Sequence, residues 1–240
     1  MCGRYTLRRG QLARAVFEAL RAPSFEEFSE GPRFNIAPSQ RLPIVRVNSK
    51  GERVIDAAEW GLVPYWAKEP PKVRPINARA ETVPTSGMFR EALDRRRCLV
   101  PADGFYEWKA RGKGPKQPYF FHMKDDGLFA FGGLYERWRG PEGAEGDEPL
   151  ETFTIITTPP NPVVSSVHDR MPLIVHPQDY ARWLDPKAGA KNVADLLRPY
   201  PPDEMEARPV SPRVNAPRND SPDCIESLTE GDDEPNDTLF

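Results

Sequence analysis

Cysteines and long apolar runs are scarce in this chain. Only three cysteines occur among 240 residues, and no two stand at CxxC spacing. Their odd number argues against a disulfide framework or a zinc knuckle, and no cysteine–histidine cluster has ligand spacing, so we expect no metal and no cofactor. No apolar run is long enough to span a bilayer, and no basic-then-apolar signal opens the chain. We therefore expect no membrane partner and a reduced, cytoplasmic location, with Cys98 as a core thiol.

Proline is abundant instead. The 28 prolines predict turns and extended segments rather than long helices, and 38% hydrophobic residues suffice to fill a core. Short apolar runs divided by turn residues predict strands at 3–7, 42–47, 54–55, 97–101, 104–109, 118–123, 128–135 and 152–157. Helical spacing and a helix-starting proline predict short helices at 11–21, 88–96, 177–183 and 191–198. This pattern predicts one α+β domain, mainly an antiparallel β-sheet or open-barrel core with a few peripheral helices.

Acidic residues gather at the C-terminus. Residues 219–240 hold eight acids and no base, and removing these eight from the 36 acids leaves 28 acids against 33 bases for residues 1–218. A mildly basic body is compatible with a polyanionic ligand. We expect a folded domain over 1–218 and a disordered, solubilising tail over 219–240.

Position 2 is the most informative position in the sequence. If Met1 is removed, Cys2 carries a free α-amine and a thiol on adjacent carbons, and both can attack one carbonyl carbon in succession. An aldehyde then gives a Schiff base and next a five-membered thiazolidine ring. The unperturbed pKa values, about 7.7–8.0 for the amine and about 8.5 for the thiol, leave both groups partly reactive near neutrality.

Three further segments place polar residues where a packed fold favours apolar ones. In an extended segment 75–82, Asn77, Arg79 and Glu81 share one face. Glu107 stands between two aromatic residues, surroundings that raise a carboxyl pKa as a general acid or base requires. His168, in a polar loop before an apolar strand, is the best candidate for a proton shuttle. Each residue has an alternative interpretation. Glu107 would be an exposed strand residue, His168 would belong to a salt bridge within its loop, and Asn77 would cap a turn.

Six motifs in order carry a family resemblance. They are Met-Cys-Gly-Arg-Tyr at the start, Phe-Asn-Ile-Ala-Pro at 34–38, Trp-Gly-Leu-Val-Pro at 60–64, Ile-Asn-Ala-Arg-Ala-Glu-Thr at 76–82, Arg-Cys-Leu-Val-Pro-Ala-Asp-Gly-Phe-Tyr-Glu-Trp at 97–108 and Val-His-Asp-Arg-Met-Pro at 167–172. From Cys2 to about Asn219 the chain resembles the SRAP family, the SOS-response-associated peptidase-like proteins. The acidic tail is not part of this pattern.

The resemblance implies a sensor of abasic sites in single-stranded DNA. Such proteins cross-link to the ring-opened sugar through the N-terminal cysteine, and the product is a thiazolidine. The implied catalytic residues are Cys2 as nucleophile, Asn77 to position the N-terminus or the sugar, Glu107 for proton transfers and His168 to act on the sugar oxygen. The implied partner is abasic single-stranded DNA, and we expect a monomer.

The resemblance also implies a DNA-binding set. Phosphate contacts would come from Arg4, Arg79 and Arg170, and the groove would be lined by Asn35, Pro38, Trp66 and Thr157, with Pro38 and Trp66 as a wedge. Some relatives carry two tryptophans where this chain has Trp66 and Ala67. Two other functions stay open: a cysteine-dependent peptidase or amidohydrolase that uses Cys2, Glu107 and His168, and a noncovalent single-strand binder with an inert Cys2.

Overall fold

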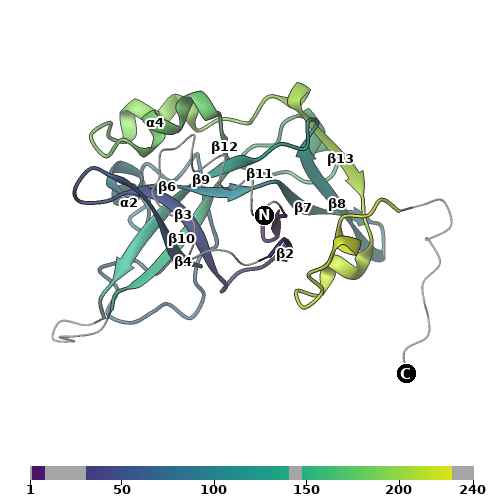
Figure 1. Ribbon diagram of the computed structural model, residues 1–240, viewed down its shortest axis with the longest axis horizontal. Helices are drawn as coiled ribbons and strands as arrows, with labels where there is room; N and C mark the ends of the chain where they lie inside the picture. The colour runs from purple at the N-terminus through teal and green to yellow at the C-terminus, as the bar shows by residue number, and fades with distance from the viewer. Residues whose placement is uncertain (1, 9–30, 141–147, 229–240) are drawn as a thin grey trace.

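The computed structural model describes residues 2–8, 31–140 and 148–228 (Figure 1). The helix expected at 11–21 and the last part of the acidic tail lie outside these residues. The strands are β1 (Tyr5–Leu7), β2 (Arg33–Ile36), β3 (Arg41–Val47), β4 (Arg53–Trp60), β5 (Asn77–Arg79), β6 (Arg97–Ala102), β7 (Gly104–Arg111), β8 (Gly114–Met123), β9 (Phe129–Trp138), β10 (Leu150–Thr158), β11 (Met171–Pro172), β12 (Ile174–Val175) and β13 (Met205–Pro209).

Helices in the described residues are short. The α-helices are α2 (Arg90–Arg95), α3 (Pro162–Ser165) and α4 (Tyr180–Leu184). The 3₁₀ turns are η2 (Pro177–Asp179), η3 (Ala190–Leu196), η4 (Pro202–Glu204), η5 (Pro212–Asn215) and η6 (Pro222–Cys224). Every 3₁₀ turn except η3 begins with a proline, whose fixed φ suits the first position of a helical turn. The expected helix at 191–198 is thus a 3₁₀ segment.

The strands form two sheets. The first has the order β13-β8-β7-β1-β2. In the second, β10, β4, β3, β6 and β9 follow one another, and β9 also pairs with β10, so these five strands close into a barrel. Among the strands of the described residues almost all pairs are antiparallel, and the parallel pairs are those of β10 with β4 and β5. The α+β class, the mainly antiparallel barrel core and the single domain are therefore confirmed.

The barrel interior is filled by aromatic and aliphatic side chains. Tyr5 of β1 packs edge-on against Trp60 and Phe131, with ring centroids 5.4 and 5.6 Å apart. Trp60 in turn stacks on Phe153 of β10. Cys98 is fully buried, as expected of a core thiol. Because Tyr5 enters this core, burial of its ring fixes the position of the first strand.

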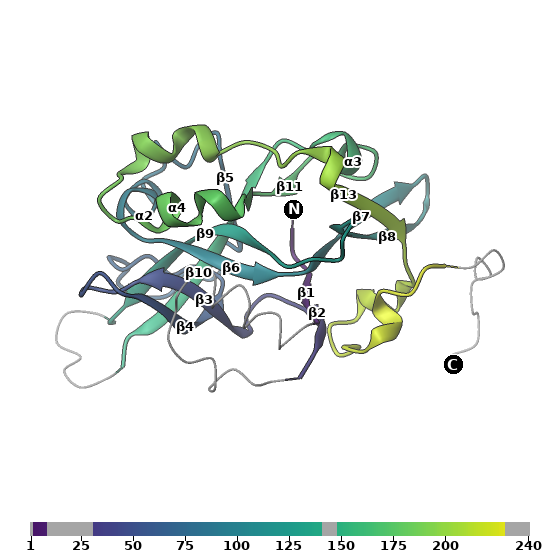
Figure 2. The same ribbon diagram turned by 45° about the horizontal axis from the view of Figure 1, so that its top comes forward.

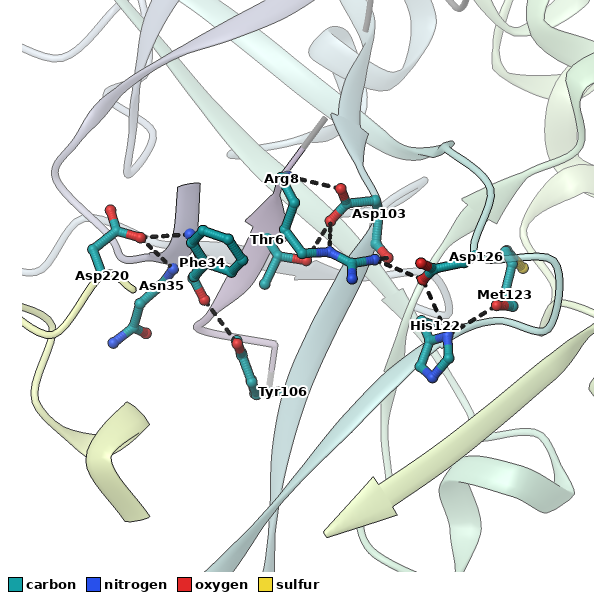
Figure 3. Close-up of polar contacts among 10 residues, drawn as sticks. All are labelled: Thr6, Arg8, Phe34, Asn35, Asp103, Tyr106, His122, Met123, Asp126 and Asp220. Carbon is teal, nitrogen blue, oxygen red and sulfur yellow. Dashed lines mark hydrogen bonds and ion pairs between the residues drawn. The ribbon is translucent and has the colours of Figure 1, made fainter. Parts of the chain in front are cut away.

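A buried carboxylate also holds β1 in place (Figure 3). Asp103, with no exposed surface, accepts hydrogen bonds from the Thr6 hydroxyl (2.5 Å), the Arg8 backbone N–H (2.7 Å) and Arg8 Nε (3.1 Å). Arg8 also pairs with Asp126 at 2.8 Å. At Gly104, opposite Thr6, an added Cβ would lie 2.2 Å from the Phe120 ring, so only glycine leaves room for this ring against the strand. These contacts fix the position of β1 and therefore of the residues that precede it.

The segment after η5 packs against the body. Asp220 accepts the backbone N–H groups of Phe34 and Asn35 (Figure 3). It also pairs with Arg33 at 2.6 Å. Cys224 is fully buried against a small cluster that includes Tyr106 and Phe120. The boundary expected after residue 218 does not fit these contacts. Residues 219–228 pack on the folded body, because Asp220 and Cys224 have partners there.

Candidate active site

The register between β1 and β7 determines which part of β7 lies beside Cys2. Tyr5 lies opposite Phe105 and Thr6 opposite Gly104, and the Tyr106 N–H donates to the Arg4 carbonyl at 3.0 Å. Continuing this antiparallel register places Gly3 opposite Glu107, next to Cys2. Cys2 has no exposed surface. Figure 1 shows β1, in purple, between the barrel and the hairpin of β7 and β8.

Glu107 and His168 come together from distant parts of the chain. His168 Nε2 lies 3.7 Å from Glu107 Oε2, and the carboxylate side chain is only 2% exposed. The loop that carries His168 follows α3 and leads into β11, which pairs with β10. The fold thus brings together Glu107 and His168, two of the residues that the family resemblance implies as catalytic.

The geometry also fixes the neutral tautomer of His168. The Arg170 backbone N–H donates to Nδ1 at 3.0 Å, so this nitrogen carries no proton in the neutral ring. The proton then lies on Nε2, the nitrogen that faces Glu107. Asp169 Oδ1 is 3.1 Å from Nδ1 and would pair with a protonated ring. In the neutral ring, His168 therefore presents a proton donor toward the carboxylate.

Burial shifts the pKa values of all three groups. Loss of water raises the pKa of Glu107 to about 7. Burial, and next the negative charge of Glu107, raises the pKa of the Cys2 thiol. Burial lowers the pKa of His168, so the ring is neutral at pH 7. The site thus combines a protonated thiol, a carboxyl group that titrates near neutrality and a neutral imidazole, a set suited to proton transfer at pH 7.

An open pocket of about 330 Å³ gives access to Glu107 and His168. It is lined by Arg4, Glu107, Trp108, Lys116, His168 and Asn215. The polar lining and the volume suit a sugar-sized polar ligand. Lys116, Trp108 and Asn215 were not predicted as site residues. Asn215 lies far from the other motifs in sequence, and Lys116 is one of many lysines, so neither carries a sequence signal.

Asn77 begins β5 and Arg170 directly precedes β11, and both strands pair with β10. Asn77 pairs with Ile155, and its side-chain Oδ1 is buried without a hydrogen-bond partner among the described residues. Arg170 forms a bidentate pair with Glu81 and donates to the Thr157 carbonyl. Glu81, which pattern alone places on the same face as Asn77, in fact holds Arg170. The buried acceptor of Asn77 is a position where a ligand N–H or O–H would be stabilised.

The expected DNA-binding residues divide into exposed and buried groups. Trp66 is 56% exposed and Arg79 is exposed, while Pro38 and Arg4 are partly buried. Asn35 and Thr157 are 0% and 1% exposed.

The buried members cannot line a groove as expected. The Asn35 amide donates to the carbonyls of Val214, Ala216 and Asn219, and its oxygen accepts from Arg4. These four bonds use the whole side chain, so Asn35 positions Arg4 and the C-terminal segment. Thr157 acts in the same indirect way, because it lies in β10 beneath Arg170.

No group of three or more histidine, cysteine or acidic side chains that could hold a metal ion occurs within the described residues. No helix in the same part of the chain is long and apolar enough to cross a membrane.

Comparison with known proteins points to one family. A sequence model described as SOS response associated peptidase (SRAP) matches residues 1–217. The chain is 43% identical over 230 residues to the abasic site processing protein YoqW of Bacillus subtilis, covering 95% of this chain and 100% of that protein. It is 34% identical over 226 residues to the abasic site processing protein HMCES of Gallus gallus, covering 81% of this chain and 66% of that one. A solved structure of a Bacteroides thetaiotaomicron protein superposes with a TM-score of 0.83 at 26% identity, covering 95% of this chain and 100% of that one.

Proposed function

Because the chain belongs to the SRAP family, whose curated relatives are named abasic site processing proteins, we propose that it senses abasic sites in single-stranded DNA and captures them covalently through Cys2. The observation that supports this most is the pair of Glu107 and His168 in one open pocket, with the buried Cys2 close enough to Glu107 for its charge to raise the thiol pKa. We further propose that the protein acts as a monomer in the reducing cytoplasm, which keeps the thiol free.

The proposed reaction begins after removal of Met1. The α-amine of Cys2 attacks the aldehyde carbon of the ring-opened sugar and forms a carbinolamine. Loss of one water gives an iminium ion, and the Cys2 sulfur then adds to the same carbon. The thiol proton departs and a thiazolidine remains, so one water molecule is the only by-product. The nitrogen and the sulfur must both be free, which only an N-terminal cysteine allows.

Glu107 supplies the base that the thiol lacks. The Cys2 pKa is raised, so the sulfur needs a neighbour to accept its proton as it attacks. A carboxyl group whose pKa is about 7 can first give its proton to the departing water and then, as a carboxylate, accept the thiol proton. His168, with its proton on Nε2, is suited to donate to the sugar ring oxygen during ring opening.

The DNA strand is proposed to follow the cations beside β10 and the exposed indole of Trp66. Arg79 is exposed, whereas the Arg170 side chain is only 12% exposed and pairs with Glu81. Trp66 offers a face on which any base can stack, which suits a lesion sensor that ignores sequence. Asn77 is proposed to hold the sugar or the Cys2 amine through its buried oxygen.

The alternative of a cysteine hydrolase fits the electrostatics less well. Cysteine hydrolases use a thiolate, stabilised by a lowered pKa. Here burial and Glu107 act in the opposite direction on Cys2. The capture reaction tolerates a protonated thiol, because the amine attacks first.

Cys2 variants test the proposal directly. An abasic single-stranded oligonucleotide is incubated with wild-type, Cys2→Ala and Cys2→Ser proteins, and heat-stable adducts are resolved on a denaturing gel. We expect an adduct with wild-type protein alone. Cys2→Ser keeps the amine, so it should form an imine that survives only after borohydride reduction. A heat-stable conjugate of Cys2→Ala without reduction would refute the mechanism.

A further inference from the structure

The rim of the pocket contains a cation that the proposed reaction does not use. Lys116 lies near the start of β8 and is exposed. Within the described residues, no salt bridge joins its ammonium to a carboxylate. It is nevertheless close enough to Glu107 and His168 for its charge to affect the pKa of both. An exposed, unengaged ammonium beside a reactive pocket is available to a ligand.

The hairpin of β7 and β8 brings Lys116 beside Trp108. Trp108 of β7 lies opposite Pro118 of β8. Lys116 precedes Pro118 by two residues, where the register between the two strands shifts. Lys116 and Trp108 both line the pocket. The lysine is thus part of a defined wall.

Asn215 completes this wall from the C-terminal segment. Its side-chain oxygen accepts the Trp108 indole N–H at 2.7 Å. The amide nitrogen is therefore left as a donor on an exposed side chain that lines the pocket. Arg4 also holds the C-terminal segment beside Trp108. Its guanidinium donates to the Val214 carbonyl and lies 5.9 Å from the Trp108 ring centroid.

The donors at this rim match an anion. Lys116 offers only N–H groups, and the free end of Asn215 adds more. The acidic member of the pocket, Glu107, is 2% exposed and has a pKa near 7, so it opposes an anion at the rim only weakly. Every abasic sugar in a DNA strand carries a phosphodiester on each side. A strand that places its sugar at Glu107 must therefore leave a phosphate close to the rim.

We propose that Lys116 and Asn215 form a subsite for one phosphodiester that flanks the captured sugar. Lys116 lies on the hairpin of β7 and β8 and Asn215 ends η5, whereas Arg79 ends β5 and Arg170 directly precedes β11, two strands that pair with β10. Figures 1 and 2 show the hairpin of β7 and β8 on one side of β1 and most of the barrel on the other. The subsite is thus a phosphate contact separate from those of Arg79 and Arg170. The inference rests on the proposed function and deepens it, by naming a contact that orients the DNA.

Noncovalent binding tests the subsite separately from the chemistry. The probe is a single-stranded oligonucleotide with a stable tetrahydrofuran abasic analogue, which has no aldehyde. Lys116→Gln should bind about fivefold more weakly, as expected for one exposed charge contact. Its log–log salt slope should become shallower by about 0.7, the value for one phosphate on a single strand. Lys116→Arg should restore both quantities, and Lys113→Gln, in the adjoining turn, should match wild-type protein.

Neutral phosphates in the probe make the test specific. A methylphosphonate is placed on the 5′ or the 3′ side of the analogue, and binding is measured for wild-type and Lys116→Gln proteins in a double-mutant cycle. One of the two methylphosphonates should weaken binding by wild-type protein about fivefold and leave the affinity of Lys116→Gln unchanged. If both neutral linkages weaken the variant as much as wild-type protein, or if Lys116→Gln keeps the wild-type salt slope, the subsite is refuted. Failure of wild-type protein to capture an aldehyde-bearing strand would instead refute the proposed function.

Discussion

Replacement of Glu107 by glutamine is expected to stabilise the protein and to slow it. Burial raises the Glu107 pKa from 4.5 to about 7, and one unit corresponds to about 1.4 kcal/mol. Above pH 7 the ionised carboxylate therefore lowers the free energy of unfolding by about 3 kcal/mol. Below pH 4.5 the carboxyl is protonated in both the folded and the unfolded protein, and the penalty disappears. The uncharged amide avoids it at every pH.

Urea unfolding at several pH values measures this effect. The stability advantage of Glu107→Gln over wild-type protein should be small at pH 4.5, grow as pH rises to about 7 and stay constant at higher pH. Glu69→Gln, at an exposed position, is the matched control and should show no such growth. Adduct formation by Glu107→Gln should be slower by about 100-fold at pH 7.5, the lower range for loss of a general base. A variant that is less stable than wild-type protein at pH 8, or a stability difference that does not depend on pH, would refute the reasoning.

Three further substitutions probe the surroundings of the site. Asp103→Ala should lower the free energy of unfolding in urea by about 3 kcal/mol, because it leaves buried donors on β1 unpaired; wild-type stability would contradict this role. Asp220→Ala should lower that energy by about 1–3 kcal/mol, measured in the same way, because two backbone N–H groups of β2 lose their acceptor; an unchanged midpoint would mean that the C-terminal segment is not held there. Trp66→Ala should weaken single-strand binding by about 1–3 kcal/mol in a fluorescence titration and leave the melting temperature unchanged, since its indole is 56% exposed; full affinity would remove it from the stacking surface.

Much of the barrel could be predicted from apolar patterning. Strands β3, β6, β7, β8, β9 and β10 follow continuous or alternating apolar runs, so local sequence is enough to find them. The short strands β2 and β13 have only four and five residues. Their pairing depends on the neighbouring strand rather than on their own pattern, so they could not be found in this way.

Part of the candidate site could also be predicted from local sequence. Glu107 has a local signal, a carboxylate between aromatic residues, and its raised pKa follows from that environment. Asn35 and Thr157 have no local signal that distinguishes a buried polar residue from a groove residue. Their burial depends on the C-terminal segment and on Arg170, which are far away in sequence.

Acidic composition misled the prediction of the tail. Eight acids without a base suggest a solvated segment, but Asp220 finds Arg33 and two backbone donors across 185 residues or more. Such long-range pairing cannot be read from charge alone. It matters for the site, because this segment carries Asn215 to the pocket rim.

Intact mass spectrometry of the protein before and after incubation with an abasic single-stranded oligonucleotide tests the central claim most directly. The protein should first be found without its initiator methionine, and then heavier by the mass of the oligonucleotide less one water molecule. In the digested adduct, the Cys2 sulfur should resist alkylation, because it is part of the ring. Capture by protein that keeps Met1, or an adduct whose Cys2 sulfur is freely alkylated, would contradict the account.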